Sequence, residues 1–316
     1  MPDSPLAASP YEILGVAPTV SDDELRKAYR RRLRETHPDA GGSAAEFHSV
    51  QHAWELVGTV ELRAAYDARG VSNRVWTISE EAPGWAPPPP KARTDSRPQA
   101  RSHGHPGGWY REAYLGMIRE WAGRGVAVED PYDPALVRNS PREVRHLLAA
   151  AVAEEESFRE LSKLGIGFTM WHDVATGVTG NDLRRDGGKL DHVVLGPTGL
   201  WGLLSEDWGA PVAVKRGELI GEAIGTGERP VHDLAARTRG FGKTVRAKFS
   251  AVGFVIPDVD SAEGVMSLGR VGGAAGLLVQ RSRLADLVRN GLPGIGLGGT
   301  NLFDLRSRLD GKVRFV

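Results

Sequence analysis

Apolar positions near the N-terminus recur with the period of an α-helix. Between residues 10 and 70 the pattern predicts a short helix through YEIL at 11–14 and a longer helix that starts at Ser21 and stops before Pro38. It also predicts a third helix at about 43–57 and a short last helix through LRAAYD at 62–67. On that last helix, Leu62, Ala65 and Tyr66 are expected to point inward. The segment is therefore expected to be a small all-α bundle.

Local signals at the helix ends support this pattern. Ser9 and Glu12 form a capping box at the start of the first helix, and Gly15 can close that helix in a left-handed conformation. Ser21 and Glu24 form a second capping box. Pro38 disfavours helical geometry in the residue before it, so the second helix is expected to end there.

The second helix is amphipathic and strongly basic. Its apolar face carries Leu25, Ala28, Tyr29 and Leu33. The basic residues cover the rest of its surface: Arg26, Lys27, Arg30, Arg31 and Arg34. A charge run of this kind is usually a solvated helix face, so the run alone does not establish a binding surface.

The pattern changes after about residue 70. From 71 to 108 the chain is rich in proline, glycine, serine and arginine, and its run of prolines at 87–90 can neither pair as a strand nor continue a helix. We therefore predict three parts: a helical domain at 1–70, a semi-stiff linker at 71–108, and a second domain at 109–316.

The second domain shows both helical and strand patterns, which predicts an α/β fold. Helical spacing occurs at 109–122, 141–164, 231–249, 282–289 and 302–309. Short apolar runs of the kind found in buried strands occur at 168–174, 190–195, 200–204, 212–214, 252–256 and 276–280.

Composition excludes several classes of function. Lysine plus arginine and aspartate plus glutamate are balanced at 40 each, so the net charge does not indicate a strongly basic nucleic-acid binder. The chain has no cysteine, which excludes disulfides, thiolate zinc sites and a cysteine nucleophile. Because no stretch is long and uncharged enough to cross a bilayer, we expect a cytoplasmic protein without a membrane partner.

The N-terminal segments YEILGV, SDDELRKAYRRRLRETHPD and ELRAAYDARG resemble the J-domain of the DnaJ family. The resemblance implies a helical hairpin that binds a DnaK-type heat-shock ATPase and stimulates its hydrolysis of ATP, in protein folding and the stress response. It assigns the contact to His37, Pro38, Asp39 and the basic face of the second helix. Ala40 departs from the lysine that many members carry, which can alter the choice of partner.

A second resemblance lies in the C-terminal half. The segment 187–217, which contains DHVVLGPTGL, is similar to the nuclease-related domain NERD, a branch of the restriction-endonuclease-like fold. The resemblance covers about 141–292 and includes Glu154, Glu155 and Phe158 on the helix upstream. Enzymes of this fold hold Mg²⁺ between two acidic residues and use a lysine two positions after the second.

The nuclease motif is degenerate in this sequence. Asp191 fits the first acidic position, but Leu204 stands at the second and Glu206 stands where the lysine is expected. Leucine cannot bind Mg²⁺, and a carboxylate reverses the charge that the reaction needs. In the alternative, Asp191 and Glu206 hold the metal while Lys215 supplies the positive charge from a neighbouring strand.

Two further polar groups have an ordinary structural interpretation. His172 and Asp173 are either a ligand pair or a solvated pair at the end of a strand, and the solvated pair is the favoured interpretation. The stretch that contains Arg237, Arg239, Lys243, Arg246 and Lys248 is either a solvated helix face or a surface that follows a nucleic-acid backbone, and the sequence does not decide between them.

Together these patterns predict a J-domain co-chaperone without enzymatic activity or cofactor, whose NERD-like module targets a client or a site. The alternative is a Mg²⁺-dependent nuclease, or a DNA-binding protein, of the restriction-endonuclease-like superfamily. A client protein or DNA is the expected partner of the C-terminal domain.

Overall fold

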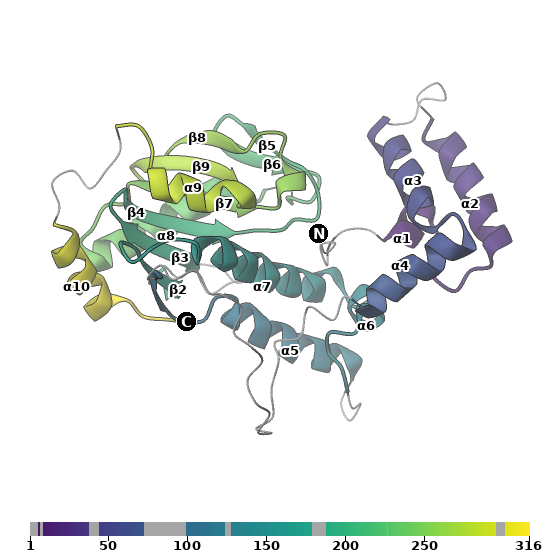
Figure 1. Ribbon diagram of the computed structural model, residues 1–316, viewed down its shortest axis with the longest axis horizontal. Coiled ribbons are helices and arrows are strands. Elements are labelled where there is room, and N and C mark those ends of the chain that lie inside the picture. The colour runs from purple at the N-terminus through teal and green to yellow at the C-terminus, as the bar shows by residue number, and fades with distance from the viewer. Residues whose placement is uncertain are drawn as a thin grey trace. The chain divides into compact units, whose positions relative to one another are not determined.

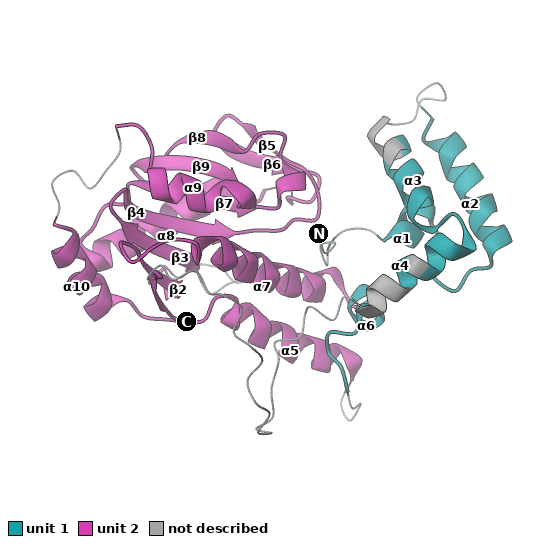
Figure 2. Cartoon of the chain, in the orientation of Figure 1, with its two compact units in different colours: residues 1–86, 129–139 teal, residues 87–128, 140–316 magenta. Residues whose placement is uncertain are grey.

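The computed structural model describes residues 6, 9–37, 44–72, 99–123, 128–178, 188–225, 227–294 and 301–316, without the side chains of 44–46, 48, 65 and 68–72. The chain divides into two compact units (Figure 2). The helical unit comprises residues 1–86 and 129–139, and the α/β unit comprises 87–128 and 140–316.

The helical unit contains α1 (Pro10–Leu14), α2 (Asp22–Glu35), α3 (Ala44–Val57) and α4 (Val60–Ser72), together with α6 (Pro134–Asn139) (Figure 1). Both predicted capping boxes are present, at Ser9 with Glu12 and at Ser21 with Glu24. Gly15 closes α1 at φ 68°, a left-handed conformation that glycine adopts without strain. The helical prediction for this part of the chain is confirmed.

An apolar cluster holds α1, α2 and α3 together. Its buried members are Tyr11, Leu14, Leu25, Val50, Ala53 and Val57. Beside it the rings of Tyr29 and Trp54 stack with their centroids 4.3 Å apart. Leu62 is 44% exposed, so the prediction that it points into the core was wrong. Tyr66 packs against this cluster as predicted. Arg63 also reaches inward from α4, where it donates to Asp22 and to the carbonyls of Pro18 and Val20.

The α/β unit is built on one mixed sheet of seven strands, in the order β1-β2-β3-β4-β7-β9-β8. The strands are β1 (Arg101–His103), β2 (Thr169–Ala175), β3 (Lys189–Gly196), β4 (Gly199–Ser205), β7 (Ala251–Ile256), β8 (Val265–Val271) and β9 (Ala274–Gln280). β2, β3 and β4 form an antiparallel meander, whereas β4, β7 and β9 are parallel. A separate ribbon pairs β5 (Val212–Lys215) with β6 (Glu218–Gly221).

Helices cover both faces of this sheet (Figure 1). One apolar cluster joins the strands to α8 (Pro230–Val245) and α10 (Leu302–Lys312). A second cluster joins the opposite face to the end of α7 (Arg142–Leu161) and to α9 (Leu284–Asn290). Another helix, α5 (Gly108–Ala122), packs along α7. Every residue of β3, β4 and β7 is buried, which explains the apolar runs of β4 and β7 and of residues 193–195 in β3.

Three strands and one helix were not predicted. β1 lies inside the segment 71–108 that was predicted as a linker, and it pairs in parallel with β2. Its three residues are exposed and polar, so no apolar alternation marks it. β6, β8 and α6 are likewise short or largely exposed. The proline run at 87–90 lies outside the described residues.

None of the helices in the described part of the chain is long and apolar enough to cross a membrane.

Candidate functional site

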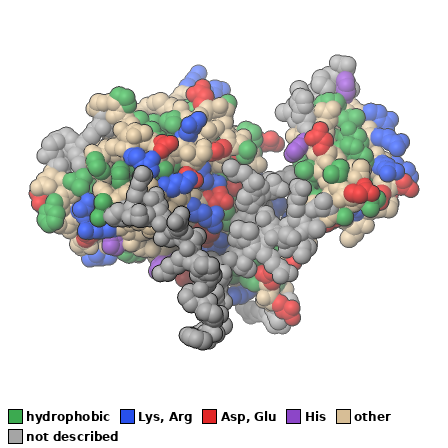
Figure 3. Space-filling view, viewed as in Figure 1, with side chains coloured by type: hydrophobic (Ala, Val, Ile, Leu, Met, Phe, Trp, Pro, Cys, Tyr) green, Lys and Arg blue, Asp and Glu red, His purple; other side chains and the backbone are tan. Residues whose placement is uncertain are grey.

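The basic face of α2 is a continuous exposed surface (Figure 3). The five predicted residues, Arg26, Lys27, Arg30, Arg31 and Arg34, are all exposed. A sixth cation on the same helix, Arg32, is engaged within the unit, because its guanidinium donates to the Ile13 carbonyl at 3.2 Å and to Glu35 at 3.2 Å. The five cations that the sequence pattern placed on the basic face are thus the exposed ones, and Arg32 is the cation that contacts the rest of the unit.

His37 follows directly after the residue that caps α2. Thr36 ends the helix by donating its hydroxyl to the Arg32 carbonyl at 2.8 Å. The half-buried imidazole of His37 meets the ring of Phe47 edge to face, with the centroids 5.1 Å apart. Pro38 and Asp39, the other two members of the predicted contact, lie outside the described residues.

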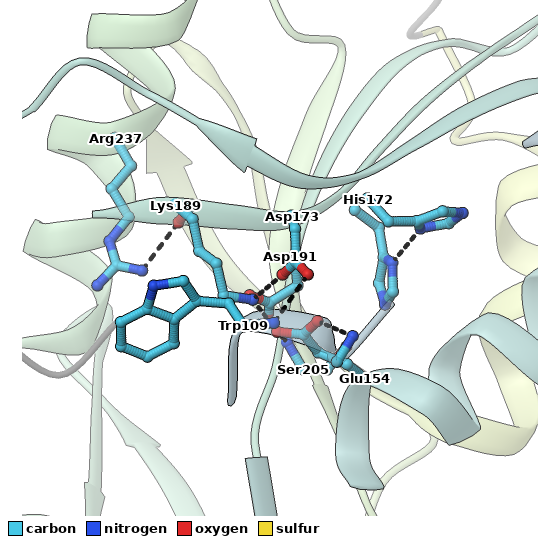
Figure 4. Close-up of polar contacts among 10 residues, drawn as sticks. Trp109, Glu154, His172, Asp173, Lys189, Asp191, Ser205 and Arg237 are labelled. Carbon is cyan, nitrogen blue, oxygen red and sulfur yellow. Dashed lines mark hydrogen bonds and ion pairs between the residues drawn. The ribbon is translucent and has the colours of Figure 1, made fainter. Parts of the chain in front are cut away.

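The α/β unit contains a second polar site, a buried ion cluster centred on Lys189 (Figure 4). The Lys189 ammonium forms ion pairs with Asp173 at 2.7 Å, with Asp191 at 2.8 Å and with Glu154. Its Nζ also lies 4.5 Å from the centre of the Tyr110 ring, within the range of a cation–π interaction. All four charged side chains are at most 5% exposed.

Backbone N–H groups complete the cluster. The N–H of Gly107 and that of Trp109, at the start of α5, donate to Glu154 and to Asp173 at 2.6 and 3.2 Å. The N–H of Ser205, the last residue of β4, donates to Asp191 at 2.6 Å. The first turn of a helix carries a partial positive charge, so α5 adds to the neutralisation of these carboxylates.

Asp173 reaches the cluster through an unusual backbone conformation. It lies inside β2 at φ 53°, a left-handed conformation that side-chain-bearing residues rarely adopt. The register of β2 against β3 passes from His172 to Val174 and leaves Asp173 without a partner. The expectation of a solvated His172–Asp173 pair was wrong, because both side chains are buried. Backbone strain held at a buried carboxylate is typical of a functional site or its remnant.

The charge state of the cluster follows from burial and from charge pairing. Burial lowers the pKa of Lys189, but Asp191, Glu154 and Asp173 together outweigh burial and raise that pKa above its usual value. For Glu154, burial and the nearby Asp191 carboxylate raise the pKa well above its usual value. The lysine is therefore charged at neutral pH, and it compensates carboxylates that have no access to water.

Two buried histidines lie beside the cluster. Their Nδ1 atoms are 2.7 Å apart, and His172 Nε2 lies 3.0 Å from the hydroxyl of Ser102 on β1. Burial lowers the pKa of His172 to about 2 and that of His192 to about 3. Both rings are neutral at pH 7, so they extend the polar network without adding charge.

The predicted nuclease residues are divided between different places. Asp191 belongs to the buried ion cluster, and Glu206 is half-buried just after β4. Lys215 is exposed on β5, opposite Glu218 in the separate ribbon, and not on a strand next to β4. The positive charge beside Asp191 is that of Lys189. Leu204 is 3% exposed and packs in the apolar cluster with α8.

Lys189 was not predicted as a site residue, because the predicted strand begins after it, at residue 190. One signal was available: in KLDHVVL, Lys189 and Asp191 stand two positions apart, so they share one face of the strand. Among the described residues, no group of three or more histidine, aspartate or glutamate side chains is arranged to hold a metal ion. The arrangement is a closed ion cluster in which an ammonium occupies the centre of three carboxylates.

Comparison with known proteins identifies the N-terminal unit. Residues 9–67 match the DnaJ domain family and form a DnaJ J-domain. Chaperone protein DnaJ 1 of Cutibacterium acnes is 46% identical over 65 residues, which cover 20% of this chain and 17% of that protein. A tetratricopeptide repeat and J domain-containing co-chaperone of Mycosarcoma maydis is 46% identical over 57 residues, which cover 18% of this chain and 10% of that protein. The matched region thus spans less than a fifth of these relatives.

Proposed function

We propose that this protein is a co-chaperone that binds a DnaK-type heat-shock ATPase through its J-domain and stimulates ATP hydrolysis. The observation that carries the proposal is the DnaJ domain at residues 9–67, with an exposed cationic face on α2 that ends at His37. In this proposal His37, Pro38 and Asp39 contact the ATPase together with that face. Relatives that match the domain are named as DnaJ chaperones.

The exposed face suits an electrostatic contact. Guanidinium and ammonium groups that lack buried partners can form charge-assisted hydrogen bonds with carboxylates of another protein. Opposite charges across an interface mainly accelerate encounter and suppress wrong partners. The partner surface is therefore expected to be acidic.

The experiment measures single-turnover ATP hydrolysis by a DnaK-type ATPase with and without the full chain. The test variant, Arg26→Ala with Arg30→Ala, removes two exposed cations from α2 while keeping a good helix former at both positions. The matched control is Arg142→Ala with Arg283→Ala, which removes two exposed cations from the α/β unit. Stimulation is expected to fall in the test variant and to persist in the control. Wild-type protein that fails to stimulate any DnaK-type ATPase would refute the proposal.

We further propose that the α/β unit is a NERD-like module of the restriction-endonuclease-like class that no longer cleaves nucleic acid and serves to target a client or a site. Two features support this proposal: the helix-strand-strand-strand order from α7 to β4, and a carboxylate cluster whose centre is filled by Lys189. An ammonium in that position leaves no room for a cation and no carboxylate free to activate water.

The competing function is a Mg²⁺-dependent nuclease in which Asp191 and Glu206 hold the ion and Lys215 supplies the positive charge. Asp191 favours it, because this residue lies at a buried polar centre. The distinguishing experiment incubates the full chain with plasmid and single-stranded DNA, with and without Mg²⁺. Cleavage that requires Mg²⁺ and disappears in Asp191→Ala would establish the nuclease.

A further inference from the structure

A basic pocket lies on the α/β unit, apart from the Lys189 cluster. It is a hollow of about 1030 Å³ between the second half of α8, the segment 246–250, the turn between β8 and β9, and α10. Ser250 lines the pocket, and its N–H donates to the carbonyl of Leu200 at 2.8 Å. Ser205, which contacts the Lys189 cluster, is five residues farther along β4, or about 16 Å away in an extended strand. The two sites therefore lie at different places along β4, and α8 borders both, since its Arg237 donates to the Lys189 carbonyl at 3.0 Å.

All the charged residues that line the basic pocket are cations. Its charged residues are Arg239, Lys243, Arg246, Lys248, Arg270 and Arg308. No aspartate or glutamate is among the described residues that line it. Nor do any of these six cations form an ion pair with a carboxylate elsewhere in the described part of the chain. Six like charges gathered without compensation repel one another, so the pocket as it stands favours an anion.

The C-terminus of α8 explains only a part of this charge. A helix C-terminus carries about half a negative charge, which one or two nearby cations would balance. The α8 helix contributes Lys243 in its last turn, and Arg246 caps it at φ 53°. Arg270 comes instead from β8 and Arg308 from α10, so separate elements bring cations to the same hollow.

Two of the arginines are held in place by backbone carbonyls. Arg308 donates from Nη1 to the carbonyl of Arg246 at 2.8 Å, and Arg270 donates from Nη2 to the carbonyl of Gly273 at 3.0 Å. A guanidinium has five N–H donors, so each retains donors for a ligand. Gly272, at φ 61°, forms part of the floor, where a Cβ would meet the Thr238 hydroxyl at 2.8 Å. The pocket therefore has a glycine in its floor, and the guanidinium groups of Arg270 and Arg308 are held in place beside it.

We propose that the basic pocket binds a ligand that carries several adjacent phosphate groups. Arginine and lysine are the side chains that recognise phosphate, arginine through two parallel hydrogen bonds and lysine as a point charge. Free oligophosphates, nucleoside triphosphates and the backbone of a nucleic acid share this chemistry. The inference does not depend on the co-chaperone function, because no residue of the helical unit takes part.

The test measures binding of a fluorescent single-stranded oligonucleotide to the full chain by anisotropy, with unlabelled tripolyphosphate, ATP and oligonucleotide as competitors. The test variant is Lys243→Glu with Lys248→Glu, since both residues are exposed and line the pocket. The matched control, Arg142→Glu with Arg283→Glu, makes the same change of charge at exposed positions near the starts of α7 and α9, where a carboxylate is favourable.

We expect the pocket variant to weaken binding by about tenfold or more at physiological ionic strength, and the control to change it by less than about twofold. Competition by tripolyphosphate and ATP would identify a small oligophosphate as the ligand, whereas competition by oligonucleotide alone would identify a nucleic-acid backbone. Absence of binding to every phosphate probe at low salt, or equal weakening in both variants, would overturn the proposal. The pocket variant should still stimulate the ATPase, so the two functions can fail separately.

Discussion

Removal of the Lys189 ammonium is expected to destabilise the α/β unit strongly. In Lys189→Met the side chain stays unbranched, is one atom shorter and loses its charge, and Glu154, Asp173 and Asp191 stay buried. At an effective dielectric constant of about 20, an ammonium 2.8 Å from a carboxylate oxygen contributes about 6 kcal/mol of attraction. The cost of desolvating the lysine offsets much of the attraction to the carboxylates. We therefore expect the free energy of unfolding to fall by about 3–5 kcal/mol, as for other buried ion pairs that lose one partner.

The same variant should also acquire a distinctive dependence on pH. The Lys189 ammonium lowers the pKa of Glu154, which burial and the Asp191 carboxylate raise, so without the ammonium this pKa should lie still further above that of the unfolded chain. The folded state then binds more protons than the unfolded state, so stability falls as pH rises above the unfolded carboxylate pKa of about 4. The loss of stability in Lys189→Met should therefore be larger near pH 8 than near pH 5.

The assay is urea denaturation of the full chain, followed by tryptophan fluorescence and by hydrogen exchange of amides in β3 and β4. Lys163→Met is the matched control, because the Lys163 side chain is 58% exposed and pairs only with Glu160 on its own surface. Its loss should be below about 1 kcal/mol. A loss in Lys189→Met as small as in this control, or one independent of pH, would refute the reasoning about the cluster.

Three further predictions follow from the sites described. Stability of the α/β unit should fall as pH drops from about 6.5 toward 3, by about 1.4 kcal/mol per pH unit for each buried histidine. The reason is that both histidines bind protons in the unfolded chain over this range, whereas in the folded unit His172 and His192 stay neutral. Urea denaturation across this range should show that the free energy of unfolding depends less steeply on pH in His192→Gln, and as steeply as in the wild type in the exposed His105→Gln. The same dependence on pH in all three proteins would contradict the neutral state of the buried histidines. Wild-type protein should show no Mg²⁺-dependent DNA cleavage above the level of Asp191→Ala, and a difference between them on an agarose gel would reverse the proposal for this unit. Affinity for the ATPase should fall steeply as salt rises above physiological strength, and a flat salt series by surface plasmon resonance would mean that the α2 cations are only solvated.

The helical unit was largely predictable from sequence because its signals are local. Ser9 with Glu12 and Ser21 with Glu24 fixed two helix starts, and apolar spacing fixed the faces that pack. The error at Leu62 arose because periodicity at the start of α4 allows more than one inward face. Arg63 fills that place instead, through contacts with residues more than 40 positions away, which no local pattern encodes.

The sheet was predictable only where strands are buried on both faces. The apolar residues of β3, β4 and β7 predicted these strands from the sequence. The three residues of β1 are exposed and join the sheet only through pairing with β2, so no apolar pattern predicted this strand. The Lys189 cluster could not be derived from spacing alone, because Glu154 approaches from a helix 35 positions earlier. The left-handed conformation of Asp173 is likewise invisible in the sequence, since side-chain-bearing residues seldom adopt it.

We propose that the J-domain acts on a DnaK-type ATPase through His37, Pro38, Asp39 and the basic face of α2. The most direct measurement compares single-turnover ATP hydrolysis stimulated by wild-type protein and by His37→Gln, with circular dichroism to verify that the variant is folded. The half-buried imidazole meets Phe47 at its edge and lies outside the apolar cluster, so the fold should persist. Wild-type protein should stimulate hydrolysis, and His37→Gln should have lost this stimulation. Stimulation by the folded variant at the wild-type level would contradict it.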